Sequence, residues 1–515
     1  MYPGTTAATA PDRIAARIAG TDDVLTYGDL EDRANRLARA WFEAGLRRGD
    51  VVALLTTNDL RAFEVYWAAM RSGLYITAVN RHLTASEIAY IVGDCGAKVL
   101  VVAGRLAEIA TELVPLTPSV QIRLAFGADV PGHLRYETFR DEAEATPLPD
   151  RPRGADMLYS SGTTGRPKGI KPPLPTAQVE EHAESLIHLA KAAWGMGEDT
   201  VYLSPAPLYH AAPLRTAAAV QALGGTVVVM QRFEAEAALE AIETHRITHS
   251  QWVPTMFVRL LKLEDDVRAR YDVSSMRMAI HAAAPCPPQV KHRMIEWWGP
   301  VITEYYASTE ANGLTLISAP EWLAHEGSVG RAVIGRIRIC DGNGAEVPVG
   351  TVGTVYFERD ELPFTYHGDP EKTRSAQHPD HPTWTTTGDL GRVDEEGYLY
   401  LADRQSFLII SGGVNIYPQE IENCLALHPA VDDVAVTGVP DEEMGESVHA
   451  WIVPSPGHAP ADEEARAALA EQITTHVRAH LAGYKVPRGV TFVDTLPRTP
   501  TGKLVKARIA APVTA

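Results

Sequence analysis

Short apolar runs alternate with longer helical stretches along this chain, and that alternation limits its fold more than any other feature. The runs are rich in valine and leucine, whereas the stretches between them are rich in alanine and glutamate. Strands that alternate with helices in this way form largely parallel sheets with helices on their faces. The sequence therefore predicts an α/β fold. The pattern comprises strands over residues 51–55, 98–102, 226–230 and 250–253, and helices over residues 60–72 and 234–244.

The length of the chain predicts more than one domain, because 515 residues exceed an ordinary single domain. Residues 147–154 and 369–382 are polar and rich in proline, which indicates surface loops. After Arg404 the pattern changes to a compact, mixed segment. We therefore expect a large N-terminal domain over residues 1–402, followed by a hinge and a small C-terminal domain over residues 403–515.

The charge of the chain excludes some classes of partner. It has 47 basic and 65 acidic residues and a formal net charge of −18. A surface of that sign repels a phosphate backbone, which argues against nucleic-acid binding but still allows a local basic pocket. The N-terminus lacks the features of a secretory signal, and no apolar stretch approaches the roughly 20 residues of a membrane helix. We expect a cytoplasmic protein without a membrane span.

The cysteines and one pair of histidines do not show metal-site spacing. Without C-x-x-C spacing, the cysteines argue against a zinc site and against a disulfide framework, and we expect buried, inert thiols. His245 and His249 lack the glutamate of an H-E-x-x-H motif. The four cysteines are Cys95, Cys286, Cys340 and Cys424.

A segment rich in glycine and hydroxyl groups, over residues 159–169, carries the strongest local signal for chemistry. Glycines let the backbone wrap around an anion, hydroxyls can donate hydrogen bonds to phosphate oxygens, and Lys168 adds a positive charge. The Walker A pattern is absent, and the alternative is a polar turn. The predicted phosphate-binding residues are Ser160, Ser161, Gly162, Thr163, Thr164, Gly165 and Lys168.

This segment closely resembles the phosphate loop of the superfamily of acyl-CoA synthetases, adenylation domains and luciferases. Further motifs follow in the family's order, so the resemblance extends from about residue 25 to residue 508 and favours the acyl-CoA synthetase branch. It implies a large N-terminal domain of mixed and largely parallel sheets with flanking helices, plus a small mobile C-terminal α+β lid domain. The motifs are Tyr306-Ala307-Ser308-Thr309-Glu310, Thr387-Gly388-Asp389, Asp403-Arg404, Ser411-Gly412-Gly413-Val414-Asn415-Ile416-Tyr417-Pro418 and Pro500-Thr501-Gly502-Lys503.

The family's chemistry explains why such residues are needed. A carboxylate is a poor electrophile because its leaving group would be oxide or hydroxide. Attack on the α-phosphate of ATP gives an acyl-adenylate, from which the thiol of coenzyme A can displace AMP. Cations and donors must surround the crowded phosphate oxygens, and a hard cation such as Mg²⁺ suits them. The expected ligands are therefore ATP, Mg²⁺, coenzyme A and a small carboxylic acid.

The resemblance assigns the adenylation residues one by one. Lys503 matches the mobile lysine that bridges the carboxylate and the α-phosphate, and Thr309 matches a phosphate-contacting hydroxyl. Glu310 matches the Mg²⁺ ligand, with Thr164 as a second metal contact. Asp389 should accept hydrogen bonds from both ribose hydroxyls, and the remaining nucleotide contacts are Arg404, Tyr305, Tyr306 and the adenine platform Ala283-Ala284-Pro285.

The resemblance also implies a site for the acid and a path for the thiol. The predicted coenzyme A contacts are Ser411, Gly412 and Gly413. The two glycines would let the chain pass close to a slender pantetheine arm. The acid should enter a mostly apolar pocket, which favours a fatty, aromatic or polycyclic acid over an amino acid. The expected pocket residues are His210, Trp252, Val253, Ala282 and Ala307.

His210 has two competing interpretations. It is either a gate between the acid pocket and the thiol entrance, able to donate a hydrogen bond to the acyl carbonyl, or a packed histidine that caps the following helix.

Some positions depart from the family pattern and leave alternatives open. Many relatives have glycine where Ala282 and Ala307 stand, and the hinge carries Ser406 and Phe407 in place of the usual charged residues. One alternative is an enzyme that performs only one half-reaction. Another is a non-catalytic protein that binds acyl-adenylates. The acid and the oligomeric state, a homodimer included, stay open.

Overall fold

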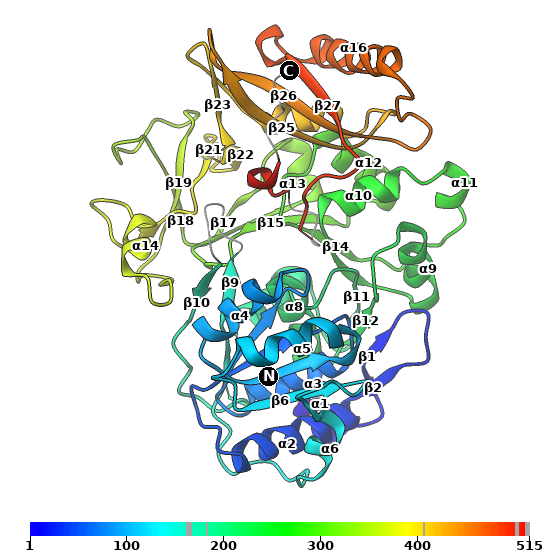
Figure 1. Cartoon of the computed structure of the whole chain (residues 1–515), viewed down its shortest axis with the longest axis vertical. Coiled ribbons are helices and arrows are strands. Elements are labelled where there is room, and N and C mark those ends of the chain that lie inside the picture. The colour runs from blue at the N-terminus through cyan, green and yellow to red at the C-terminus, as the bar shows by residue number, and fades with distance from the viewer. Residues whose placement is uncertain (161–166, 182–183, 405–406, 500–503, 510–515) are drawn as a thin grey trace. The chain divides into compact units, whose positions relative to one another are not determined.

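The computed structural model of the chain describes residues 1–160, 167–181, 184–404, 407–499 and 504–509 (Figure 1). Contacts between residues divide the chain into two compact units. The first unit comprises Met1–Gln251, Glu264–Ala279 and Phe364–Pro370, and the second comprises Trp252–Leu263, Ile280–Pro363 and Glu371–Ala515.

A six-stranded parallel sheet forms the core of one half of the first unit. Its strand order is β7-β6-β5-β3-β4-β8. Every residue of β3 is buried, which is typical of a parallel strand that is covered on both faces. The strands are β3 (Val51–Leu55), β4 (Tyr75–Val79), β5 (Ala97–Ala103), β6 (Ile122–Phe126), β7 (Leu134–Arg135) and β8 (Ala155–Asp156), and the helices between them include α3 (Arg61–Met70), α4 (Ala85–Asp94) and α5 (Ala107–Leu116).

A second sheet of the first unit is also largely parallel. Strand β12 pairs with β1 and β11, and β11 pairs with β13, all in parallel, whereas β2 adds an antiparallel edge. The elements are β1 (Ile14–Ile18), β2 (Val24–Thr26), β11 (Val201–Ser204), β12 (Thr226–Val229) and β13 (His249–Trp252), with the helices α7 (Ser185–Trp194), α8 (Ala211–Ala222) and α9 (Ala235–His245).

The second unit consists mostly of antiparallel sheets. One set of antiparallel strands is β15 (Ile302–Ala307), β16 (Leu314–Ser318) and β17 (Arg331–Ile334). Another sheet has, in order, β18 (Arg336–Cys340), β19 (Gly353–Glu358), β21 (Asp389–Val393) and β22 (Leu399–Arg404). The last sheet, β24-β23-β26-β25, packs against two helices through a shared apolar core that includes Ile421, Leu425, Ile473 and Val477. Its elements are β23 (Ile409–Ser411), β24 (Val414–Ile416), β25 (Val431–Asp441), β26 (Gly445–Pro454), α15 (Pro418–Leu425) and α16 (Glu463–His480).

The predicted α/β fold is confirmed, with a large part built on parallel sheets and a small α+β part at the C-terminal end. The predicted strands and helices correspond to β3, β5, β12, β13, α3 and α9 within a few residues. The boundary between residues 402 and 403 stays a prediction. Among the described residues, no helix combines the length and apolar character that a membrane crossing requires.

The prediction of a plain surface loop over residues 369–382 is wrong. Helix α14 (Pro370–Ser375) occupies its first half, and His378 is buried in its second half. Proline directly after aspartate suits the first position of a helix, because its missing N–H has no partner there anyway. The Nε2 atom of His378 lies 2.7 Å from the carbonyl oxygen of Gly344, which fixes the segment to a neighbouring turn.

The cysteines are only partly as predicted. Cys95 and Cys340 are buried, but Cys286 and Cys424 are half-buried, so the expectation of burial is wrong for those two. Burial raises the pKa of all four thiols, that of Cys95 to about 11. A thiol with a raised pKa is rarely ionised near neutral pH and therefore reacts slowly.

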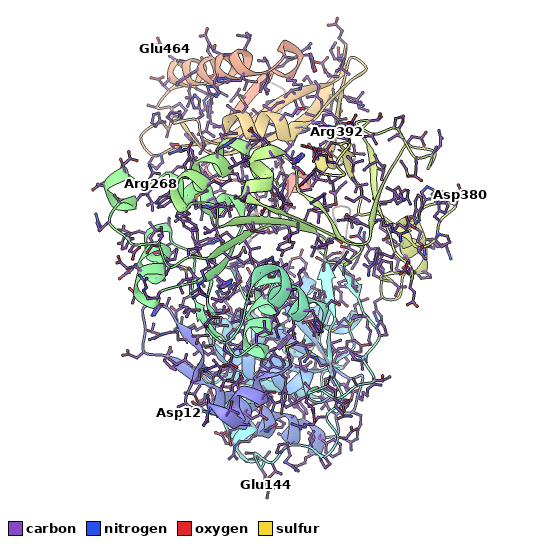
Figure 2. The ribbon with its side chains drawn as sticks, turned by 180° about the vertical axis from the view of Figure 1, so that it is seen from behind. Asp12, Glu144, Arg268, Asp380, Arg392 and Glu464 are labelled. Atoms are coloured by element: carbon purple, nitrogen blue, oxygen red, sulfur yellow. The ribbon has the colours of Figure 1, made fainter. Side chains whose placement is uncertain are left out.

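The acidic surplus lies at the surface. Asp12, Glu144, Asp380 and Glu464 are exposed and are labelled at the edge of the molecule in Figure 2. Buried carboxylates, in contrast, have cationic or hydrogen-bonding partners, as such groups must when they lose their water.

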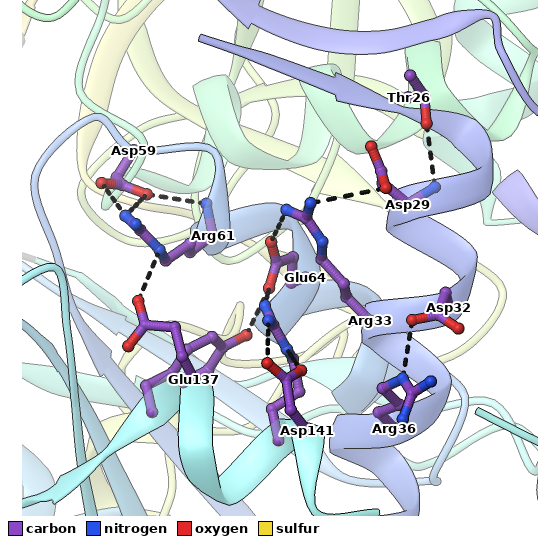
Figure 3. Close-up of polar contacts among 12 residues, drawn as sticks. Thr26, Asp29, Asp32, Arg33, Arg36, Asp59, Arg61, Glu64, Glu137 and Asp141 are labelled. Atoms are coloured by element: carbon purple, nitrogen blue, oxygen red, sulfur yellow. Dashed lines mark hydrogen bonds and ion pairs between the residues drawn. The ribbon is translucent and has the colours of Figure 1, made fainter. Parts of the chain in front are cut away.

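Glu64 is the clearest example of a buried, paired carboxylate in the first unit (Figure 3). It lies on α3 with 1% of its side chain exposed, and its Oε1 is 3.1 Å from Nη1 of Arg33 on α2 (Tyr27–Glu43). Its Oε2 accepts hydrogen bonds from Tyr136 at 2.9 Å and Arg140 at 2.8 Å, both on α6 (Tyr136–Asp141). The Glu64 carboxylate thus connects the helices α2, α3 and α6.

We expect Glu64→Gln to lower the free energy of unfolding of the first unit by about 3 kcal/mol, because the buried Arg140 loses one of its two charged partners and keeps only Asp141. Urea denaturation followed by fluorescence measures this change. The control is Glu43→Gln, whose exposed carboxylate lies 4.0 Å from Arg39 and should contribute about 0.5 kcal/mol or less. Equal effects of the two substitutions would contradict the role of Glu64.

Candidate functional site

The predicted phosphate loop lies between the two strands of a hairpin in the first unit. Strands β9 (Leu158–Ser160) and β10 (Lys168–Ile170) are antiparallel, and Ser160 is the register partner of Lys168. Nζ of Lys168 lies 5.2 Å from the ring centroid of Tyr366, and the carbonyl oxygen of Gly169 accepts a hydrogen bond from the backbone of His367. The predicted contacts Ser161, Gly162, Thr163, Thr164 and Gly165 lie outside the described residues.

His210 directly precedes helix α8 in the first unit. It occupies the N-cap position, but its side chain makes no capping hydrogen bond, so the capping interpretation is wrong. Its Nε2 is buried and has no hydrogen-bond partner within the described part of the chain. Burial, with a smaller contribution from His82, lowers the pKa of His210 to about 4. The ring is therefore neutral near pH 7 and can donate or accept a hydrogen bond without carrying charge.

The predicted ribose ligand Asp389 belongs to a hydrogen-bonded cluster in the second unit. Oδ2 of Asp389 accepts hydrogen bonds from Tyr306 at 2.6 Å and from Thr387 at 2.8 Å. Asp389 begins β21 (Asp389–Val393) and is the register partner of Arg404 at the end of β22 (Leu399–Arg404). The fold thus brings three motifs together, and the two donors hold the carboxylate in one orientation.

The predicted adenine platform contains a backbone conformation that is unusual for alanine. Ala283 has φ +76° and Ala311, directly after Glu310, has φ +53°. A side chain in the left-handed region costs about 1–2 kcal/mol relative to the right-handed one, and such residues cluster at functional sites. Ala282 is buried, and its N–H donates to the carbonyl oxygen of Trp252 at 3.3 Å.

The remaining predicted residues of the second unit differ in exposure. Glu310 is buried, whereas Ala307 and Thr309 are half-buried. Val253 is buried, and the ring of Trp252 packs against those of Phe257 and Trp298 at centroid distances of 6.1 and 5.5 Å. Trp252 is therefore a core residue, and its contact with the acid stays a prediction. Lys503 lies outside the described residues.

A cavity of about 530 Å³ opens beside the predicted thiol loop. Ser411 and Gly412 line it together with Arg478 and Arg488, so two cations face the same hollow as the loop. Gly412 and Gly413 have φ +55° and +78°, a conformation that favours glycine. The loop therefore needs its glycines for backbone reasons alone. Arg478 and Arg488 are cations at the cavity, and Nη1 of Arg488 lies 3.3 Å from Oδ2 of Asp441.

Family models match both parts of the chain. A model of the AMP-binding enzymes matches residues 4–366, and a model of the AMP-binding enzyme C-terminal domain matches residues 420–503. The chain belongs to the family of AMP-binding enzymes.

Two relatives of this AMP-binding enzyme are named as CoA ligases. It is 33% identical over 515 residues to a feruloyl-CoA synthase of an Amycolatopsis species, with 99% of this chain and 97% of the relative covered. It is 31% identical over 514 residues to the long-chain-fatty-acid–CoA ligase FadD13 of Mycobacterium tuberculosis, with 97% and 95% covered. The predicted superfamily and the enzyme class, AMP-forming acid–thiol ligases, are confirmed.

A solved structure from another branch of the family shares the fold. The amide bond synthetase McbA from Marinactinospora thermotolerans superposes with a TM-score of 0.80 at 28% identity, and 98% of each chain is covered. The relatives named here thus include ligases with different acceptors.

Two groups of charged residues in this AMP-binding enzyme, one half-buried and one buried, have no counterpart among the predicted residues. In the first unit, Arg215 on α8 lies 3.5 Å from Asp156 on β8 and 3.6 Å from Glu184. Burial raises the pKa of Asp156 to about 6, and Arg215 opposes that rise. The pair links the helix that follows His210 to the strand that precedes the phosphate hairpin.

The second group includes His281, which is close in sequence to the predicted adenine platform. Nζ of Lys291 on α12 (Pro288–Trp298) is 2.6 Å from Oε2 of Glu304 on β15, and both side chains are buried. His281 has its Nε2 3.6 Å from the same oxygen. Burial lowers the pKa of His281 well below its usual value and raises that of Glu304. The only sequence signal for this group is a charged residue within an otherwise apolar strand or helix face.

We expect Tyr306→Phe to raise the KM for ATP about tenfold, because the Asp389 carboxylate loses the hydrogen bond that Tyr306 donates. A hydrogen bond to a charged group is worth roughly 1.5–3 kcal/mol. The measurement is the initial rate of pyrophosphate release against ATP concentration. A matched control is Tyr400→Phe, which removes a similar bond of 3.1 Å to Asp394 away from the predicted nucleotide contacts. An unchanged KM in Tyr306→Phe, or the same change in both variants, contradicts the assignment.

Proposed function

We propose that this enzyme joins a hydrophobic carboxylic acid to coenzyme A by way of an acyl-adenylate. The observation that carries the choice of coenzyme A is the cavity lined by Ser411 and Gly412 together with Arg478 and Arg488. A narrow backbone loop suits a pantetheine arm, and guanidinium groups suit the phosphates at its other end. The hydrogen-bonded Asp389 supports the nucleotide side of the same proposal.

In the first half-reaction, the acid attacks the α-phosphate of ATP and pyrophosphate leaves. The loop over residues 160–165 and Lys168 would bind phosphate oxygens, and Lys503 would stabilise the charge shared by the carboxylate and the α-phosphate. Asp389, Arg404 and the platform Ala283-Ala284-Pro285, with Tyr305 or Tyr306, would bind the nucleoside.

Mg²⁺ would offset the charge of the triphosphate, and the residues fit that ion. Glu310 supplies a buried carboxylate, which is a hard oxygen ligand of the kind that Mg²⁺ prefers. Thr164 would add a hydroxyl oxygen. Thr309 would contact a phosphate oxygen beside them.

The proposed acid is fatty, aromatic or polycyclic. The ferulate and long-chain fatty acid named for two relatives belong to these classes. The pocket would include Val253, Ala282 and Ala307 beside Trp252. His210 is neutral and has a buried Nε2 without a partner among the described residues, so it can donate a hydrogen bond to the acyl oxygen as charge develops there.

In the second half-reaction, the thiol attacks the acyl carbon and AMP leaves as a thioester forms. Gly413 would lie along the path of the thiol. The enzyme could instead stop after one half-reaction, or pass the acyl group to an amine, as the name of McbA indicates for that relative.

One experiment separates these outcomes. A panel of aliphatic, aromatic and polycyclic acids is incubated with ATP and Mg²⁺, and AMP, pyrophosphate and acyl-CoA are quantified separately with coenzyme A or an amine as acceptor. The proposal predicts acyl-CoA and AMP in equal amounts for hydrophobic acids. Acid-dependent pyrophosphate without thioester, or amide as the main product, contradicts it.

We expect Lys503→Ala to slow adenylation about 10²–10³-fold, like the loss of one preorganised donor to a developing negative charge. Thioester formation from a supplied acyl-adenylate should be affected much less. Single-turnover assays of the two halves measure both effects. Lys191→Ala, at an exposed position near the end of α7, is the control. Equal loss in both halves contradicts the assigned role.

We expect Gly413→Leu to lower the yield of acyl-CoA and to spare pyrophosphate release, because a large side chain would block the thiol path. Gly457→Leu is a matched control, since Gly457 has a similar φ of +82° and also has open space where a side chain would begin. The two variants therefore carry the same backbone strain. If both products fall together in Gly413→Leu, the assignment of the thiol path is wrong.

A further inference from the structure

Three potential metal ligands meet at one edge of the small C-terminal part of the chain. Cys424 lies near the end of α15, and His476 and His480 lie one turn apart in the last turns of α16. One ligand atom from each side chain lies within 4.8 Å of the others. The spacing of the cysteines predicted no zinc site, but 52 residues separate Cys424 from His476, so the fold, not a local motif, creates the cluster.

The packing of the two helices holds these ligands close together. Ile421 and Leu425 of α15 share a buried core with Leu469, Ile473 and Val477 of α16. Residues four apart on a helix project from the same face, so His476 and His480 lie on one side of α16. Their rings are 4.4 Å apart between centroids.

Hydrogen bonds to carbonyl oxygens fix one nitrogen of each histidine as a donor. Nδ1 of His480 lies 2.8 Å from the carbonyl oxygen of His476, and Nε2 of His476 lies 3.3 Å from that of Cys424. A carbonyl oxygen can only accept, so each of these ring nitrogens carries the proton. The other nitrogen of each neutral ring then presents a lone pair. Histidines that bind metals commonly have this arrangement, in which a carbonyl orients the ring.

A third histidine packs against the cluster without joining it. The ring of His428 packs edge-on against that of His476 at 4.9 Å between centroids. Its Nδ1 accepts a hydrogen bond from the backbone N–H of Ala430 at 3.2 Å, so that lone pair is already in use. His428 therefore packs against the His476 ring and limits its rotation.

We propose that Cys424, His476 and His480 form a binding site for a divalent transition metal ion, and that Zn²⁺ is the ion this ligand set fits best. One thiolate and two imidazoles are borderline-soft ligands that suit zinc, and a water molecule would complete a tetrahedron. The Cys424 thiol loses its proton to solvent as the sulfur–metal bond forms. Tetrahedral zinc ligands lie roughly 3.5 Å apart, a separation that small rotations of these side chains can reach. The ion would join α15 to α16.

Metal binding to the untagged full-length enzyme tests this site. The protein is stripped with a chelator and dialysed against Zn²⁺, bound metal is measured by mass spectrometry, and competition with a chromophoric chelator gives the Kd. We expect one Zn²⁺ per chain. Cys424→Ser and His480→Gln should each weaken binding by about 10–100-fold or more, whereas His458→Gln, at an exposed position of the same part of the chain, should leave the Kd unchanged.

Two further readouts separate loss of a ligand from loss of folding. Co²⁺ in place of Zn²⁺ should give a thiolate-to-cobalt charge-transfer band that Cys424→Ser abolishes. Zn²⁺ should raise the Tm of the unsubstituted enzyme and not that of His480→Gln, which lies at the exposed end of α16 and should fold normally without metal. Absence of stoichiometric Zn²⁺, or binding that neither substitution weakens, overturns the proposal.

Discussion

The buried ion pair between Lys291 and Glu304 is the interaction on which the nucleotide side of this enzyme depends. Neither charge can remain in the interior without the other, because removal of one partner from a buried pair typically costs about 3–5 kcal/mol. The pair joins α12, which follows the predicted adenine platform, to β15, which contains Tyr305 and Tyr306 and leads to Glu310. One ion pair therefore connects the two segments that contain the predicted adenine platform and the predicted contacts Tyr305 and Tyr306.

Backbone strain and local positive charge each occur at predicted binding residues. Ala283 and Ala311 are two of only three non-glycine residues with positive φ among the described parts of the chain. Ala283 is a predicted nucleotide contact, and Ala311 directly follows the predicted metal ligand Glu310. The chain as a whole is strongly acidic, yet Arg478 and Arg488 face the cavity beside Ser411 and Gly412. An anionic ligand in this cavity would meet local cations on a protein whose overall charge repels it, which favours a defined site over diffuse binding.

The sequence was sufficient for the elements whose signals are local. Residues 51–55 and 226–229 form strands because continuous apolar runs suit parallel strands covered on both faces. The motifs indicated a candidate site because glycines, hydroxyls and charges occur together within a few residues. Contacts between distant residues were not predictable in this way. Tyr306 and Asp389 are 83 residues apart, and neither has a neighbour in sequence that indicates their hydrogen bond.

The errors have physical causes of the same kind. The polar composition of residues 369–382 indicated a loop, but a proline at the start of α14 and the packing of His378 order the segment. The position of His210 before a helix suggested capping, yet its side chain makes no capping hydrogen bond. In each case tertiary packing decided what local composition could not.

The central claim is that adenylation and thiol transfer occur in sequence on this one chain. The most direct test is a single-turnover experiment in which enzyme, acid, ATP and Mg²⁺ are mixed without thiol, the bound acyl-adenylate is quantified, and coenzyme A is then added. The account predicts that acyl-adenylate accumulates first and is then converted to acyl-CoA with release of an equal amount of AMP. Acyl-adenylate that does not form without coenzyme A, or that persists after its addition, would contradict the account.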